Sequence, residues 1–157
     1  MKVKVEISDH STGHWVPNDK LCRNWIEHAM RGANRENPVT VSLCFVDAGE
    51  SEQLNRRYRD RQYPADVLSF PSAMPAALRE QLDSEPLGDI VVCAELAQRE
   101  ALSWDKPVDH HWAHLVIHGC LHLLGYDHAA HKDAADMEKI EIEILRNLGI
   151  PDPYLVS

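Results

Sequence analysis

The sequence lacks a continuous apolar run of the roughly 20 residues that a membrane-spanning helix needs. Its most apolar stretch, residues 111–125, is interrupted by four histidines. The N-terminus also lacks the apolar core of a signal peptide, because Lys2, Lys4 and Glu6 alternate there with β-branched residues. We therefore expect a protein without a membrane span that remains in the cytoplasm.

Closely spaced cysteine pairs are also missing. The four cysteines are far apart and form no C-x-x-C motif, which argues against a zinc ribbon or a dithiol redox centre. Three of the four lie among apolar neighbours, as a small hydrophobic residue would. We expect reduced, mostly buried thiols at Cys22, Cys44, Cys93 and Cys120.

Positive charge is scarce, and the formal net charge of the chain is -9. Indiscriminate binding to nucleic acid depends on neutralising phosphates, so this charge disfavours it but leaves room for a local basic site. Histidine, in contrast, is abundant: six of the 10 histidines fall between residues 110 and 128. This clustering indicates a functional site in segment 110–128.

The 157 residues suit one domain, 1–157, of the α/β (α+β) class with a single sheet. Alternating or β-branched runs predict strands at 1–10, 38–46, 67–70 and 89–94. Helical spacing predicts helices at 17–33, with Pro17 in the first turn, and at 48–60, 94–104, 107–124 and 131–148. The proline-rich segment 71–88 is expected to be a surface loop with at most a short helical turn.

The segment HGCLHLLGYDH, residues 118–128, is similar to the metzincin zinc signature H-E-x-x-H-x-x-G-x-x-H. His118 and His122 are one helical turn apart, so their imidazoles can bind one metal ion. Gly125 can adopt the left-handed conformation that ends a helix and returns the chain, which would bring His128 to the same point. The alternative is a set of histidines that only bond to backbone carbonyls.

The glutamate of the protease signature is absent, and Gly119 takes its place. Three imidazoles with an open fourth position are typical of a catalytic zinc site, and Cys120 is expected to point to the other face of the helix. Zinc lowers the pKa of bound water to about 7, so the site does not need a dedicated base to form hydroxide. Nickel and copper also accept three imidazoles.

Two neighbours of the predicted ligands have open roles. Asp127 either orients an imidazole or takes a proton from water, and the alternative is an aspartate in a tight turn. His114, one turn before His118, could reach a substrate or remain a solvated residue on the helix face.

A second group of candidate residues contains four arginines, Arg56, Arg57, Arg59 and Arg61, within six residues of an otherwise acidic chain. The planar guanidinium suits phosphate and stabilises charge that develops on a transferring phosphoryl group. A solvated helix face is the simpler interpretation for Arg56, Arg57 and Arg61. Spacing alone does not distinguish Arg59 from them.

Four motifs in family order resemble the YbeY-like endoribonucleases of bacterial ribosomal RNA maturation. They are LNRRYR at 54–59, DVLSFP at 66–71, LGDI at 87–90 and HLVIHGCLHLLGYDH at 114–128. Ala65 departs from the threonine that usually precedes DVLSF, so no role is expected of a hydroxyl there.

The resemblance implies metal binding by His118, His122 and His128, a catalytic or RNA-binding role for Arg59, and a role for His114. It implies one zinc ion and a mostly parallel four-stranded sheet beside a helical layer that holds the metal as in metalloproteases. The expected activity is cleavage of single-stranded RNA in 16S rRNA 3′-end maturation and ribosome quality control. Expected partners are ribosomal RNA and the ribosome, small-subunit ribosomal proteins and an assembly GTPase, with no DNA.

Two other functions stay open at this point. A metallopeptidase or amidase would normally need the glutamate that Gly119 replaces, to move a proton from water to the leaving amine. A ribosome-assembly factor with purely structural zinc would need no catalytic residues.

Overall fold

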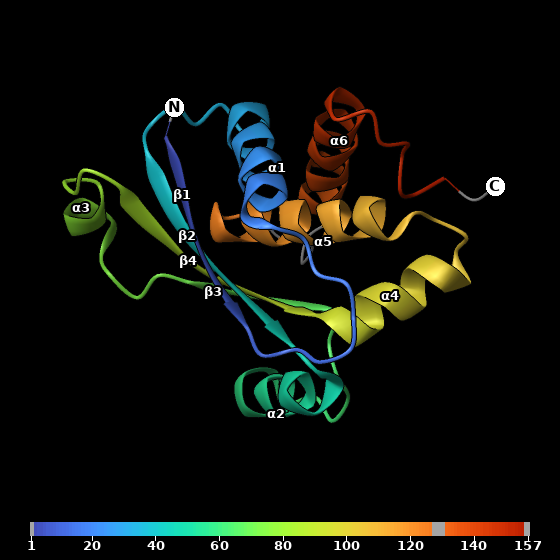
Figure 1. Cartoon of the computed structure of the whole chain (residues 1–157). Coiled ribbons are helices and arrows are strands. Elements are labelled where there is room, and N and C mark those ends of the chain that lie inside the picture. Colours follow the sequence, from blue (N-terminus) through green and yellow to red (C-terminus); the bar gives the residue numbers. More distant parts are fainter. Residues whose placement is uncertain (1, 127–130, 156–157) are drawn as a thin grey trace.

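Four strands form one mixed sheet in the order β1-β2-β4-β3 (Figure 1). The computed structural model describes residues 2–126 and 131–155. Strands β1, β2 and β4 are parallel, and the edge strand β3 is antiparallel to β4. The expectation of one mostly parallel sheet is confirmed. The strands are β1 (Val3–Asp9), β2 (Val39–Val46), β3 (Val67–Pro71) and β4 (Glu85–Cys93).

Helices cover both faces of this sheet. Figure 1 shows α1, α5 and α6 on one side and α2 on the other, where a small cluster of Val46, Leu68 and Val91 is buried. The helices are α1 (Asp19–Gly32), α2 (Ala48–Arg59), α3 (Ala76–Arg79), α4 (Ala94–Ser103), α5 (Val108–Leu123) and α6 (His131–Asn147).

The predicted elements differ from the observed ones in two places. Helix α1 starts after Pro17, because the side chain of Asn18 caps the helix by accepting a hydrogen bond from the backbone N–H of Leu21. Strand β4 starts at Glu85, four residues before the predicted start, because the buried Glu85 carboxylate pairs with Arg79 at 2.8 Å and fixes the end of the preceding loop.

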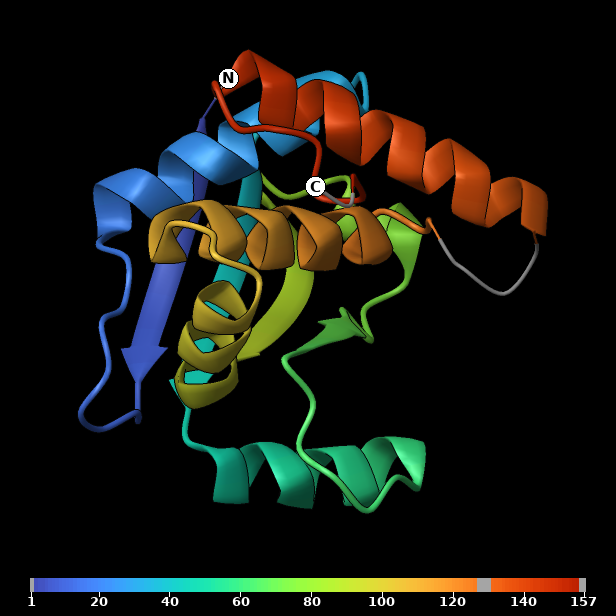
Figure 2. The same cartoon turned by 90° about the vertical axis from the view of Figure 1, so that its right-hand side faces the viewer.

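Helix α5 lies between the sheet and the helices α1 and α6 (Figure 2). Its buried residues therefore point in several directions and include Trp112 on one side and Leu115 and Leu121 on others. The histidines of this helix do not all share its accessible side, because His111 is only 2% exposed. Its Nε2 forms a 2.8 Å contact with Oε1 of Glu100 on α4.

Gly119 allows α5 to approach the sheet closely. A Cβ at this position would lie 2.8 Å from Cγ2 of Ile90, closer than real Cβ contacts, and 3.1 Å from Oγ of Ser69, which is tighter than most of them. The Ser69 hydroxyl donates a 3.0 Å hydrogen bond to the carbonyl of Gly119. Gly119, which replaces the glutamate of the protease signature, thus allows α5 to pack closely against Ile90 and Ser69 of the sheet.

The cysteines behave as the sequence predicts. Cys22, Cys93 and Cys120 are buried and Cys44 is half-buried, and all four thiols are free. Burial raises the pKa of Cys22 and of Cys120 to about 12, so both remain neutral.

In the part of the chain that the structure describes, no helix combines the length and apolarity needed to cross a membrane.

Candidate metal centre and cleft

His118 and His122 bring two ring nitrogens together on α5. Their Nε2 atoms lie 3.1 Å apart. Two nitrogens bound to one zinc ion at about 2.0–2.1 Å with tetrahedral angles would be separated by roughly 3.4 Å, so the observed pair nearly has the spacing of metal ligands. The helical spacing of the sequence therefore produces the convergence that a shared metal ion needs.

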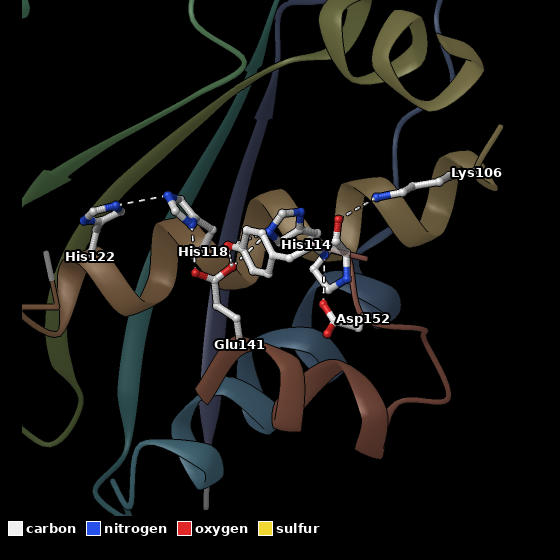
Figure 3. A network of polar contacts seen from close by, with 8 residues as sticks. Lys106, His114, His118, His122, Glu141 and Asp152 are labelled. Atoms are coloured by element: carbon white, nitrogen blue, oxygen red, sulfur yellow. Dashed lines mark hydrogen bonds and ion pairs between the residues drawn. The ribbon is translucent and has the colours of Figure 1, made fainter. Parts of the chain in front are cut away.

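Glu141 on α6 orients His118 and also contacts His114. Its Oε1 accepts a 3.0 Å hydrogen bond from Nδ1 of His118, and its Oε2 accepts a 2.9 Å hydrogen bond from Nε2 of His114. Figure 3 shows the three imidazoles following one another along α5, with Glu141 approaching from α6. Because Nδ1 of His118 carries the donated proton, its Nε2 presents a lone pair towards His122.

The C-terminal segment completes this network. The Tyr154 hydroxyl donates a 2.9 Å hydrogen bond to Oε2 of Glu141. Lys106 holds the segment by donating a 3.2 Å hydrogen bond to the carbonyl of Pro153, and the Asp152 carboxylate accepts from the backbone N–H of Tyr154 at 2.8 Å (Figure 3). Residues after α6 are thereby fixed beside the histidine helix.

Glu141 is 0% exposed but remains ionised. Burial alone would raise its pKa, but the hydrogen bonds and electrostatic attraction that His114 and His118 contribute outweigh it and lower the pKa to about 2. Burial and the nearby Glu141 raise the pKa of Tyr154, which therefore stays a neutral donor. An ionised carboxylate therefore accepts the Nδ1–H hydrogen bond of His118.

His114, His118 and Glu141 form a group whose ligand atoms lie within 4.8 Å of one another, so they could also hold a metal ion. Their contacts are already hydrogen bonds of 2.9 and 3.0 Å, in which the carboxylate accepts from both rings. This arrangement corresponds to the carboxylate–histidine pairs that stand behind metal ligands. The Nε2 side of His118 is the better position for a metal, and it faces His122.

His118 and His122 also line a cleft of about 900 Å³. Arg59, the last residue of α2, lines the same cleft. Helix α2 ends there because Asp60 adopts a left-handed conformation, with φ of 55°. The structure therefore brings together the two motifs that the sequence singled out separately.

Two carboxyl groups also line this cleft. Asp66, just before β3, and Glu100 on α4 share a hydrogen bond, and Glu100 also contacts the imidazole of His111. Burial, followed by the charge of Glu100, raises the pKa of Asp66.

The remaining predicted site residues have different outcomes. His114 is not among the described residues that line the cleft, and its ring instead contacts Glu141 and Tyr154. Asp127 and His128 lie outside the described residues, so the third metal ligand and the role of Asp127 stay predictions.

Glu141 and Tyr154 were not predicted from the sequence. Glu141 occupies the apolar stripe of α6, four residues after Met137 and four before Leu145, both of which are buried. An acidic residue on such a stripe indicates a buried partner. Tyr154 follows the last helix and gives no comparable indication.

An α/β domain that presents paired imidazoles and an arginine in one cleft has the groups that a metal-dependent hydrolase of phosphate esters uses. Comparison with known proteins specifies the class further. The family model described as "Endoribonuclease YbeY" matches residues 6–149.

Relatives named endoribonuclease YbeY align over most of the chain. One from Pseudomonas putida is 47% identical over 139 residues, 88% of this chain and 85% of that protein. One from Cellvibrio japonicus is 42% identical over 153 residues, 98% of this chain and 84% of that protein. The solution structure of TM1509 from Thermotoga maritima has a TM-score of 0.56 and 24% identity, covers 96% of this chain and 99% of that one, and shows a shared fold.

The chain belongs to the endoribonuclease YbeY family. The family resemblance stated from the motifs is confirmed. The expectation of an RNA-cleaving hydrolase is confirmed at the level of the family.

Proposed function

We propose that this chain is a zinc-dependent endoribonuclease that cleaves single-stranded RNA during maturation of the 16S rRNA 3′ end and in ribosome quality control. The observation that supports this proposal most directly is the shared cleft of His118, His122 and Arg59. A phosphodiester bound between the imidazole pair and the guanidinium would have a ligand site for a metal on one side and a fixed positive charge on the other.

The proposed metal ligands are His118, His122 and His128. The 3.1 Å approach of the first two Nε2 atoms fits one zinc ion, as does the carboxylate behind His118. Zinc bound there would supply a water of lowered pKa and a positive charge for the phosphoryl oxygens. Nickel and copper would fit the same donors.

The protein's own side chains have separate proposed roles. Arg59 binds the phosphate and stabilises the negative charge that develops on its oxygens. His114 acts through Glu141, which it hydrogen-bonds at 2.9 Å, and so positions His118. Asp127 is proposed to orient an imidazole or to accept a proton from the attacking group, which is water or the RNA 2′-hydroxyl.

A metallopeptidase is the weaker alternative, because the glutamate of the protease signature is absent and a side chain at position 119 would crowd Ile90 and Ser69. In the proposed setting the protein works in the cytoplasm on ribosomal RNA, beside small-subunit ribosomal proteins and an assembly GTPase. The net charge of -9 is compatible with this setting if the ribosome delivers the RNA to the arginine-lined cleft.

Cleavage of a single-stranded ribosomal RNA fragment by Arg59→Ala and Arg57→Ala proteins tests the proposal. Arg57 is a matched control: it lies two residues away, its guanidinium stacks over the Tyr58 ring at 5.4 Å, and it is not among the described residues that line the cleft. We expect Arg59→Ala to reduce kcat about 100-fold or more with unchanged metal content, and Arg57→Ala to leave it unchanged. Undiminished cleavage by Arg59→Ala would remove Arg59 from the mechanism.

His118→Ala separates the enzyme from an assembly factor with structural zinc. If the variant stays folded, the enzyme should lose both metal and RNA cleavage, and cells that carry it should accumulate unprocessed 16S rRNA. An assembly factor would retain normal rRNA processing as long as it remained folded.

A further inference from the structure

The segment after α2 forms one wall of the cleft. Arg59, Arg61 and Tyr63 line it, whereas the intervening Asp60 and Gln62 are not among the described lining residues. The left-handed Asp60 turns the chain at the end of the helix, and Gln62 and Tyr63 form a bend. The cleft wall therefore contains two guanidinium groups and an aromatic ring, and Asp60 is not among its described lining residues.

Buried polar side chains of α2 hold this segment in place. The Asn55 amide donates a 2.7 Å hydrogen bond to the carbonyl of Tyr63, and the Ser51 hydroxyl both donates to the carbonyl of Ala65 at 2.6 Å and accepts from its N–H at 2.9 Å. Asn55 is 2% exposed and Ser51 is 1% exposed. The backbone on either side of the Tyr63 ring is thus fixed before any ligand binds.

The Tyr63 ring itself remains accessible. It is 53% exposed, and the guanidinium of Arg61 donates a 3.3 Å hydrogen bond to its hydroxyl. An exposed aromatic ring on a rigid backbone, beside cationic side chains, combines the two elements that bind single-stranded nucleic acid: a stacking face for a base and charge for the backbone.

We propose that Tyr63 stacks against a base of the RNA strand next to the cleaved phosphodiester, and that Arg61 binds the phosphate of that nucleotide. The proposal rests on the proposed function and adds a substrate-binding subsite to it. It commits to a single-stranded substrate, because a base within a duplex is already stacked on both sides and does not offer a free face to a protein ring.

Charge supports a nucleic-acid ligand at this wall. Two arginines, Arg59 and Arg61, line the cleft, although the chain as a whole carries a net charge of -9. Two acidic side chains, Asp66 and Glu100, also line the cleft, and burial followed by the charge of Glu100 raises the pKa of Asp66. The wall therefore attracts a polyanion locally.

Steady-state cleavage by the zinc-loaded protein tests the subsite. We compare the unmodified protein with Tyr63→Leu, Tyr63→Phe and the matched control Tyr58→Leu. Tyr58 is 57% exposed and also belongs to this arginine-rich region, but its ring packs edge-on against Phe70 at 5.2 Å and is not among the described cleft residues. Tyr63→Leu should raise KM about tenfold with a smaller change in kcat, because one base-stacking contact is lost. Tyr58→Leu should match the unmodified protein, and Tyr63→Phe, which keeps the ring, should raise KM less than Tyr63→Leu does.

A second kind of substrate makes the test independent of how well the variants fold. Two RNA substrates are used, each of which lacks one base: the base on the 5′ side of the cleaved linkage in one, and the base on its 3′ side in the other. Both keep every phosphate, but one of them lacks the base that Tyr63 would stack against. The unmodified protein should cleave one of these substrates with about tenfold lower kcat/KM, and Tyr63→Leu should show no such difference.

The outcomes separate this inference from the proposed function. If the unmodified protein cleaves neither the intact RNA nor either of the RNAs that lack a base, the proposed function fails. If it cleaves RNA but is indifferent to the missing base on both sides, or if Tyr63→Leu has an unchanged KM, the stacking subsite is wrong and the endoribonuclease remains.

Discussion

Nδ1 of His118 donates a 3.0 Å hydrogen bond to Oε1 of Glu141, and this contact determines which nitrogen of His118 faces His122. With the proton held on Nδ1, the lone pair of Nε2 points to the position where the two imidazoles are 3.1 Å apart. A buried carboxylate behind a ligand also makes the imidazole more basic. The proposed metal site on α5 therefore depends on a residue from α6.

Replacing Glu141 by glutamine should weaken zinc binding about 10- to 100-fold, because a neutral amide no longer raises the basicity of His118 or accepts from both histidines. Glu143→Gln, two residues along the same helix on an exposed position, provides the control and should bind zinc normally. Titration against a chelating dye measures both affinities. Equal affinities for Glu141→Gln and the unmodified protein would show that Glu141 does not support the metal.

Gly119→Ala should destabilise the fold by about 1–3 kcal/mol, because the new Cβ would overlap Ile90 and Ser69 at the sheet. Gly49→Ala is the matched control: nothing lies within 4 Å of a Cβ there, and alanine favours helix α2. That variant should be more stable by about 0.5 kcal/mol. Urea unfolding measures both changes, and an unaffected Gly119→Ala protein would contradict the close packing of α5.

Asp66 should give stability a distinct pH dependence. Its pKa is raised by burial and by Glu100, so the unfolded chain, in which the pKa is near 3.8, loses this proton at lower pH than the folded chain does. The free energy of unfolding therefore falls as pH rises from about 3.8 through the raised pKa of the folded state. Asp66→Asn should remove this fall, so its stability relative to the unmodified protein increases across that window.

Urea unfolding at a series of pH values checks this expectation. The exposed Asp136→Asn protein serves as the control and should follow the unmodified protein. If the Asp66→Asn and unmodified curves run parallel, the pKa of Asp66 is not raised in the folded state.

Local sequence pattern predicted most of the sheet and the approach of two of the three proposed metal ligands. The alternation of Val39, Val41 and Leu43 marks a strand in any context, and one helical turn between His118 and His122 brings their rings together regardless of the rest of the fold. Gly125 likewise has the left-handed conformation, with φ of 102°, that its place after α5 suggested.

Contacts between distant segments could not be predicted in the same way. Glu141 reaches His118 only because α6 packs across α5, and Tyr154 reaches Glu141 only because Lys106 holds the C-terminal segment. The early start of β4 has the same origin, since the Arg79–Glu85 pair forms in three dimensions. Gly119 is the clearest example. The sequence shows only that the glutamate of the protease signature is absent, whereas the structure shows that glycine lets α5 approach the sheet closely.

The most direct test of the account measures metal content and RNA cleavage in the same preparation. We predict one zinc ion per chain, loss of single-strand ribosomal RNA cleavage when a chelator removes it, and recovery of cleavage when zinc is added back. The His118→Ala protein should neither bind the ion nor recover activity. Cleavage that persists at full rate in the metal-free protein would contradict the account.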